Sequence, residues 1–195
     1  IPNNVVSIGW SVFSGCISLT NIDIPDDVTS LGGRTFSGCT SLASIEIPDG
    51  VTTLDEYIFQ DCSSLASVKI GKGVTSIADY TFLRCTSLAF IEIPDNVSSI
   101  SQYVFDGCSS LSSVIIGDGL TSLGKTFTAC SSLESIVIGD GITTIDQWAF
   151  NNCSSLSSVT IGKSVTVIDY AAFADCSSLT SINIPDNVTA IGPFA

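Results

Sequence analysis

The chain of 195 residues is apolar enough for a packed core: 45% of its residues are hydrophobic and 13% are charged, which excludes a disordered chain. Nineteen acidic residues against six basic ones give a net charge of −13 at pH 7, which argues against nucleic acid and anionic membrane surfaces as partners. No apolar run approaches the roughly 18 residues of a membrane span, so we expect no membrane insertion of this segment.

A repeat of 23 residues runs through the whole chain, with one interval of 22. It is marked by a cysteine in each copy, a phenylalanine three residues before it and a leucine three residues after it. The cysteines are Cys16, Cys39, Cys62, Cys85, Cys108, Cys130, Cys153 and Cys176. The phenylalanines are Phe13, Phe36, Phe59, Phe82, Phe105, Phe127, Phe150 and Phe173. Eight coincident copies indicate a solenoid of about eight coils.

Each coil is expected to contain a short parallel strand, a tight turn and a convex segment. In the third interval Leu65, Val68 and Ile70 alternate as the inward side of the strand. The turn that follows, 71–73, is Gly-Lys-Gly where other coils have Pro-Asp-Gly or Pro-Asp-Asn. The stretch 78–84 is predicted to form a single helical or 3₁₀ turn that returns the chain to the core.

We expect residues 1–195 to form a single solenoid domain. One coil has too few inward apolar positions to be stable alone, and stacking at the ~4.8 Å strand spacing joins those positions into continuous columns. Because Ile1-Pro2-Asn3-Asn4-Val5 reads as the middle of a repeat and the chain has no methionine, we expect a fragment of a longer array. In the intact protein, further coils or caps would cover both ends.

The fifth copy is one residue short: the segment 123–127 stands where other coils have six residues, as in 54–59. We predict a tightened convex turn there and an unchanged strand register.

The pattern Leu-x-x-Ile-x-Ile-Pro-Asp-x-Val-x-x-Ile-x-x-x-x-Phe-x-x-Cys-Ser-Ser resembles the BspA-like leucine-rich repeats of bacterial and protist surface proteins. The resemblance covers the whole chain and implies a right-handed, horseshoe-like leucine-rich-repeat solenoid. Ordinary leucine-rich repeats carry an Asn ladder after the strand, whereas here that part of the repeat holds Pro25, Pro48, Gly71 and Pro94. The resemblance also implies an extracellular or cell-surface location and adhesion to a protein or glycan ligand.

Catalysis, metals and cofactors are not expected. The chain has no histidine, which removes Ser-His-Asp and Cys-His catalysis and most zinc sites. One cysteine per coil lacks the close spacing of a metal cluster, so we interpret the cysteines as a column of small, buried core thiols. Stacking of adjacent coils is expected to bring the Cα atoms of these cysteines within disulfide range, but each thiol then has two equivalent neighbours and no unique partner. We therefore predict that the chain is not an enzyme.

The candidate binding residues face outward from the strands, on the concave face where horseshoe proteins usually bind. One outward column reads Asn21, Ser44, Ser67, Phe90, Ser113, Ser135, Ser158 and Ser181. The other reads Asp23, Glu46, Lys69, Glu92, Ile115, Val137, Thr160 and Asn183. An apolar patch beside charged side chains is typical of a partner site, and ordinary variation at solvent-facing positions is the alternative. The candidates are Glu46, Lys69, Phe90, Glu92, Ile115 and Val137.

Three further features have both a structural and a functional interpretation. The aromatic residues Tyr57, Tyr80, Tyr103 and Trp148 are expected to pack over the convex turns, with a carbohydrate or protein contact as the alternative. A hydroxyl ladder runs through Thr29, Thr52, Thr75, Ser98, Thr121, Thr143, Thr166 and Thr189, and such an array can order water and bind ice. Asn96 and Asn187 lie in glycosylation acceptor sequences at turns expected to be exposed.

These observations predict a non-catalytic binding or adhesion module of a cell-surface or secreted protein. The alternative is a structural spacer array without a specific ligand, and an ice- or carbohydrate-binding surface comes third.

Overall fold

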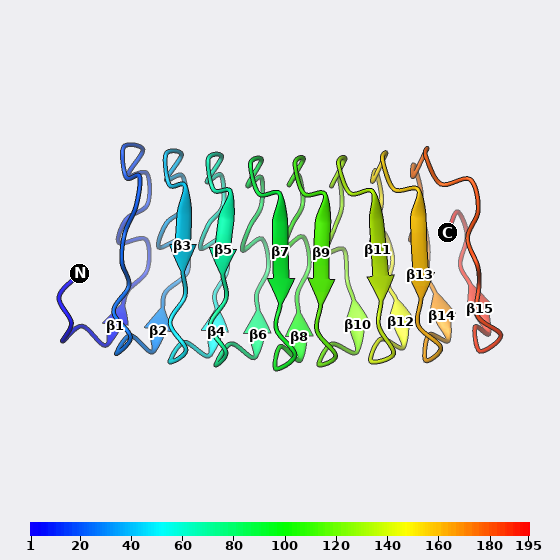
Figure 1. The fold of residues 1–195 in the computed structure, drawn as a ribbon, viewed down its shortest axis with the longest axis horizontal. Coiled ribbons are helices and arrows are strands. Elements are labelled where there is room, and N and C mark those ends of the chain that lie inside the picture. The colour runs from blue at the N-terminus through cyan, green and yellow to red at the C-terminus, as the bar shows by residue number, and fades with distance from the viewer.

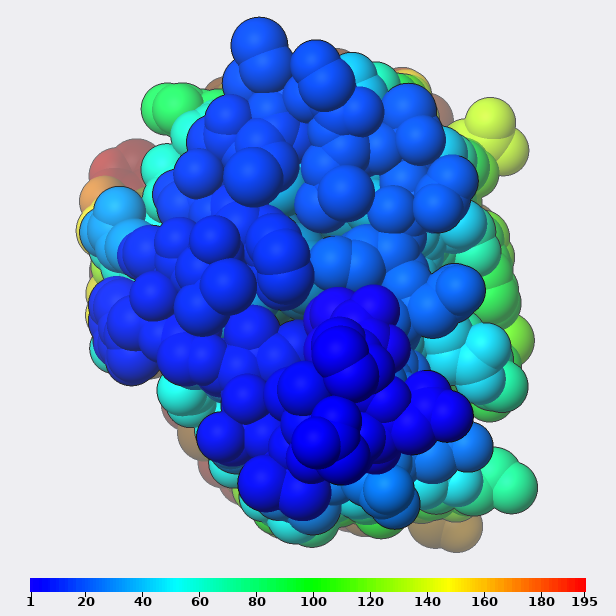
Figure 2. All heavy atoms as spheres, turned by 90° about the vertical axis from the view of Figure 1, so that its left-hand side faces the viewer, coloured from blue at the N-terminus to red at the C-terminus, as the bar shows by residue number.

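The computed structural model describes residues 1–195 and shows a parallel β-solenoid without helices. In Figure 1 the coils lie side by side in a nearly straight row, with the two ends of the chain at opposite ends of the row. Figure 2 looks along the stack from its N-terminal end, where the first coils, in blue, lie over the coils behind them. No helix has the length and apolar character that a membrane crossing requires.

The predicted strands are present in the six inner coils and form one side of the stack, whereas the equivalent segments 21–24 and 181–184 of the first and last coils are not strands. The six strands are β3 (Ser44–Glu46), β5 (Ser67–Lys69), β7 (Phe90–Ile93), β9 (Ser113–Ile116), β11 (Ser135–Ile138) and β13 (Ser158–Ile161). Hydrogen-bonded parallel pairs join β3 to β5, β7 to β9 and β11 to β13. Side chains alternate between solvent and core along each strand, as in β7, where Ile91 and Ile93 are buried. The predicted inward positions are therefore confirmed.

Each coil also contains a second, two-residue strand that the sequence analysis did not predict. These strands are β1 (Ser7–Ile8), β2 (Ser30–Leu31), β4 (Thr53–Leu54), β6 (Ser76–Ile77), β8 (Ser99–Ile100), β10 (Ser122–Leu123), β12 (Thr144–Ile145), β14 (Val167–Ile168) and β15 (Ala190–Ile191). They form a sheet in the order β1-β2-β4-β6-β8 and another in the order β10-β12-β14-β15. A strand of two residues is too short for the alternation by which a sequence reveals a strand.

The helical or 3₁₀ turn predicted for 78–84 is wrong. Tyr80 and Arg84 have φ values of 59° and 57°, in the left-handed region that interrupts any right-handed helix. Their amide N–H groups donate to the next coil, to the carbonyl oxygens of Gln102 at 3.2 Å and Asp106 at 2.8 Å. Because the bonds run between coils, the backbone groups are satisfied without a helix, and the neighbouring coils hold the unusual φ values in place.

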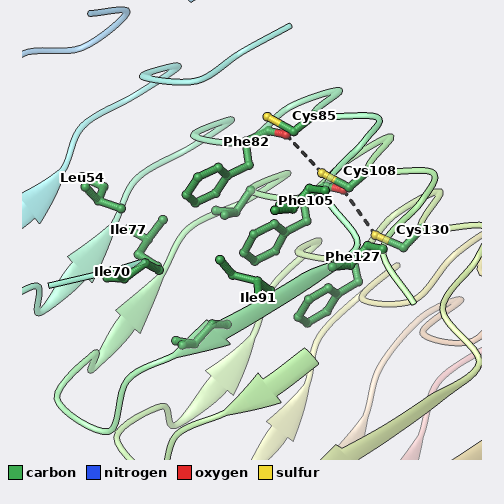
Figure 3. Packing of buried hydrophobic residues seen from close by; sticks show 14 of the residues in the cluster. Leu54, Ile70, Ile77, Phe82, Cys85, Ile91, Phe105, Cys108, Phe127 and Cys130 are labelled. Atoms are coloured by element: carbon green, nitrogen blue, oxygen red, sulfur yellow. Dashed lines mark hydrogen bonds between the residues drawn. The ribbon is translucent and has the colours of Figure 1, made fainter. Parts of the chain in front are cut away.

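The predicted phenylalanine column forms the centre of a core of 45 buried residues. Successive rings stack nearly parallel along the whole array, at centroid distances of 5.3 to 5.6 Å and interplanar angles of at most 9°. Figure 3 shows three of them, Phe82, Phe105 and Phe127. The rings from Phe36 to Phe150 are fully buried, whereas Phe13 near the start of the stack is only partly covered.

The cysteine column is buried as predicted, and its thiols also act as donors. From Cys39 to Cys176, each thiol donates to the carbonyl oxygen of the phenylalanine of the preceding coil, at Sγ–O distances of 3.0 to 3.3 Å. Figure 3 shows two of these bonds, from Cys108 and Cys130. Burial raises the pKa of the Cys62 thiol to about 12, so the donor stays protonated. Cys16 is exposed because no preceding coil covers it, which corrects the expectation of a uniformly buried column.

The short fifth copy affects the structure more than predicted. Its side chains keep their inward and outward positions, and the paired residues of β10 and β12 are 22 apart instead of 23. The short strands β8 and β10, however, are not paired, so the sheet of short strands is interrupted there. The Thr126 hydroxyl is buried without a partner, whereas the hydroxyl of Thr81 at the same repeat position donates to the carbonyl oxygens of Asp55 and Ala78. The tightened turn therefore leaves one buried hydroxyl without a partner, and the interruption of the short-strand sheet lies directly before this turn.

Candidate functional site

The solvent-facing side of β3, β5, β7, β9, β11 and β13, here called the long-strand face, holds the predicted binding residues. Three large apolar side chains stand out on it: Phe90 is 45% exposed, Ile115 is 52% exposed and Val137 is 63% exposed. Most of the other outward positions on these strands carry serine, threonine or a charged residue. The structure therefore places the apolar candidates on one face and leaves them open to solvent.

The three apolar residues lie on consecutive strands. In the β7–β9 register Phe90 lies opposite Ser113, and Glu92 lies opposite Ile115. Phe90 and Ile115 are thus diagonal neighbours, a separation of about 7–8 Å that large side chains can span. β11, which carries Val137, is in contact with β9, and Figure 1 shows β7, β9 and β11 side by side.

The predicted charged residues lie on the neighbouring strands of the same face. Glu46 and Lys69 lie opposite each other in the β3–β5 register and form an ion pair. Both side chains are well exposed, 67% and 72% respectively, so solvent screens the pair. The hydrogen bond to Glu46 raises the pKa of the Lys69 ammonium group. Lys69 therefore points toward Glu46, and no ion pair links it to Glu92 on its other side.

A groove borders Phe90 and extends into the turns that follow the long strands. Five carboxylates and two lysines line it, so its charge is predominantly negative. The carboxylates are those of Asp26, Glu46, Asp49, Glu92 and Asp95. Among these only Glu46 has a cationic partner within ion-pair distance.

Sequence reasoning missed the turn residues of this groove, including Lys72, Asp49 and Asp95. Acidic residues are common in turns, and the sequence analysis gave these no separate role. In the structure the Asp49 carboxylate accepts the backbone N–H of Lys72 at 2.7 Å, and Asp95 accepts that of Asp118 at 3.3 Å. The sequence carries one signal for these turn residues, since aspartate recurs at the same turn position in six of the copies.

The convex aromatic residues pack against one another. Tyr57, Tyr80 and Tyr103 stack with centroid distances of 4.8 and 5.2 Å. Arg34 lies over the Tyr57 ring at 4.3 Å, and Lys125 lies 4.0 Å from the Trp148 ring centroid. Neighbouring rings and cations thus occupy faces that a sugar would stack on, which favours the packing interpretation.

The hydroxyl ladder is also used between coils. The side chains of Thr75, Thr143, Thr166 and Thr189 each donate to the backbone carbonyl of the preceding coil at 3.2 Å. Their protons are therefore engaged within the protein, and only the oxygen lone pairs and the methyl groups face solvent.

The two candidate glycosylation residues lie in exposed turns, as the sequence analysis expects. The Asn187 side-chain nitrogen donates to the Lys163 carbonyl at 2.6 Å, and that of Asn96 donates to the Val74 carbonyl. A sugar on either nitrogen would have to displace or share this hydrogen bond. Their glycosylation stays a prediction.

The cysteine and carboxylate side chains are the chain's main potential metal ligands. No group of three or more cysteine, aspartate or glutamate side chains is arranged to hold a metal ion. All eight cysteines are free thiols, and burial raises the pKa of those in the core, including Cys153 to about 12.

Repeated parallel strands stacked on leucine and phenylalanine columns, with an exposed strand face, define a leucine-rich-repeat solenoid. The family model described as "BspA type Leucine rich repeat region (6 copies)" matches residues 1–111 and 75–195, which together span the chain. The chain therefore belongs to the BspA-type leucine-rich repeat family, as its sequence pattern predicts.

Solved structures of bacterial leucine-rich repeat proteins share this fold. The Treponema pallidum leucine-rich repeat protein is 25% identical with a TM-score of 0.76, over 97% of this chain and 86% of that one. A leucine-rich repeat protein from Bacteroides ovatus is 25% identical with a TM-score of 0.69, over 98% of this chain and 67% of that one. The pneumococcal vaccine antigen PcpA is similar in fold alone. It is 18% identical with a TM-score of 0.63, over 98% of this chain and 57% of the PcpA chain. No curated protein sequence is significantly similar to the chain.

Proposed function

We propose that the chain is a non-catalytic binding or adhesion module of a cell-surface or secreted protein, and that it binds a protein or glycan through the long-strand face. The observation that carries this proposal is the run of exposed Phe90, Ile115 and Val137 on consecutive strands beside a charged groove. Exposed apolar patches flanked by charge are typical of partner sites. Full burial of one such side chain contributes roughly 1.5–3 kcal/mol to an interface.

Membership of the BspA-type family supports this proposal, including the location at or outside the cell surface. Repeat solenoids present broad surfaces made of many equivalent strands, and they use these surfaces to bind large ligands. The net charge of −13 favours a protein or glycan over nucleic acid or an anionic lipid surface.

The proposal of a non-catalytic role rests on the chemistry of the side chains. Without histidine, a serine or cysteine nucleophile lacks its usual general base. The core thiols are buried and protonated, so they are poor nucleophiles at neutral pH.

The test is a binding screen of the purified chain against extracellular matrix proteins, glycans and whole cells. A double variant, Phe90→Ser with Glu92→Lys, is measured in parallel, and Gln147→Lys on the convex side is the control for the added charge. Saturable binding that the double variant loses and the control keeps, with both melting temperatures retained, would support the proposal. Binding that both variants keep would place the site elsewhere.

The second candidate is a spacer array without a specific ligand. It is favoured by the serine that occupies six of the eight positions in the Phe90 column, since such a surface offers little for recognition. A spacer binds nothing saturably in the screen, with or without the substitutions.

A further inference from the structure

We propose that Phe90 and Glu92 form a subsite for an arginine side chain of the partner, in the acidic groove that Asp95 also lines. This inference rests on the proposed function, because it specifies what the long-strand face recognises. In the subsite the guanidinium group lies over the Phe90 ring and donates hydrogen bonds to the Glu92 carboxylate, while Asp95 adds negative charge further along the same groove.

The Phe90 ring is accessible to a partner from the solvent side of β7. Phe90 and Glu92 are alternate residues of β7 and both face solvent, so their Cα atoms are about 6.5–7 Å apart on the same face. The residue opposite Phe90 in the next strand is Ser113, and the same repeat position in the preceding strand is Ser67. Both neighbours are small, which leaves the ring 45% exposed. A planar group of the partner therefore has space to stack on it.

The charge beside the Phe90 ring is negative. Neither Glu92 nor Asp95 forms an ion pair, because the nearby Lys69 is paired with Glu46. Asp95 accepts one long backbone hydrogen bond, at 3.3 Å, and retains further acceptor capacity. The Glu92 carboxylate beside the open aromatic face, together with the Asp95 carboxylate of the same groove, attracts a cation from outside the chain.

A flat aromatic ring beside a carboxylate favours arginine over lysine. A guanidinium group is planar, stacks on an aromatic face and donates in its own plane to carboxylates, whereas an ammonium group acts as a compact point charge that is strongly hydrated. The chain itself places Arg34 over Tyr57 and Lys125 over Trp148 on the convex side. No cation of the chain lies over Phe90. A partner arginine over Phe90 would therefore form the same kind of cation–π contact that Arg34 and Lys125 form within the chain.

The experiment uses three synthetic peptides that differ only at a central arginine, lysine or glutamine. Their affinities for the full chain are measured by NMR titration, since a single subsite binds weakly. We expect the arginine peptide to bind about five- to tenfold more tightly than the lysine peptide, as a desolvated cation–π contact allows. Phe90→Ser and Phe90→Leu should both abolish this preference, and Glu92→Gln should weaken the binding of both cationic peptides. Asp186→Asn, which removes a carboxylate at the Asp95 repeat position in another coil, is the matched control and should leave the preference unchanged.

Equal affinities for the arginine and lysine peptides would overturn the inference. The absence of binding up to ~10 mM peptide would also overturn it, as would a preference for the arginine peptide that survives Phe90→Ser. A macromolecular ligand that is lost with Val137→Ser and unaffected by Phe90→Ser would also overturn it, while the proposed function would stand. Arginine-selective binding at Phe90 without any macromolecular ligand in the screen would keep the subsite and contradict the proposed function.

Discussion

The short fifth copy predicts a specific way to stabilise the protein: insertion of an aspartate between Gly124 and Lys125, which restores the 23-residue coil. Most regular coils have inter-coil bonds beside the short strand, such as Ser101 N–H to the Ile77 carbonyl at 2.9 Å. The amides that flank β10, those of Thr121 and Gly124, donate no such bond to the preceding coil. Regaining two backbone hydrogen bonds and a partner for the Thr126 hydroxyl stabilises by about 1 kcal/mol each. Ordering one additional residue costs about 1.5 kcal/mol, so the free energy of unfolding should rise by about 1.5 kcal/mol.

The assay is urea unfolding combined with native-state hydrogen exchange. In the natural chain the amides of β10 should exchange faster than those of the equivalent strand β6, and the insertion should slow them. The melting temperature should rise by about 3–6 °C. The control inserts an aspartate between Ala78 and Asp79, in a regular coil, where it should destabilise. An insertion at 124 that lowers the unfolding free energy, or leaves β10 exchange unchanged, would refute the reasoning.

Three further predictions concern the core and the surface charges. Phe105→Ala should lower the free energy of unfolding by roughly 3–5 kcal/mol. Phe13→Ala should lower it by clearly less, because Phe13 is only partly buried. Equal losses for the two variants in urea unfolding would contradict a core built on the stacked phenylalanine column. A thiol reagent should label Cys16 quickly in the native protein and the other cysteines only on unfolding. Burial raises the pKa of the Cys62 thiol to about 12 in the folded state, so its contribution to stability is fully present below the pKa of the unfolded thiol. The free energy of unfolding, measured as a function of pH, should therefore fall as the pH rises from that value toward about 12. Glu46→Gln should leave the midpoint of urea unfolding essentially unchanged, because its ion pair with Lys69 is exposed; a large shift would show that the pair stabilises the fold.

Much of the fold could be predicted from the sequence because the repeat reports each structural column several times. A single phenylalanine or cysteine says little, but eight at a spacing of 23 identify the coil and its core side. Features without a distinct side-chain pattern were not predictable. The short strand β6 has only two residues, and the left-handed conformation of Tyr80 depends on hydrogen bonds to Gln102 in the next coil. The missing pairing of β8 and β10 likewise has no signal in the sequence, because these two strands keep the regular spacing of 23 residues.

The candidate site could be predicted in part. Phe90 interrupts a column of serines, so the sequence marks it as different, and alternation along the strand places it in solvent. The groove beside it depends on turn residues such as Lys72 and Asp95, whose sequence pattern is that of any turn. Which carboxylates stay unpaired also depends on the direction of Lys69, and a sequence does not determine that direction.

The central claim is that the long-strand face binds the ligand, and it is tested most directly by removing the apolar patch. The triple variant Phe90→Ser, Ile115→Ser and Val137→Ser replaces each large apolar side chain by serine, the residue that six of the eight coils carry in the Phe90 column. Its affinity for a ligand found in the screen is compared with that of the natural chain at matched melting temperature. The account predicts that saturable binding is lost while the fold is retained, because these side chains are exposed and contribute little to the core. Unchanged affinity in a folded triple variant would contradict it and place the binding surface on another side of the solenoid.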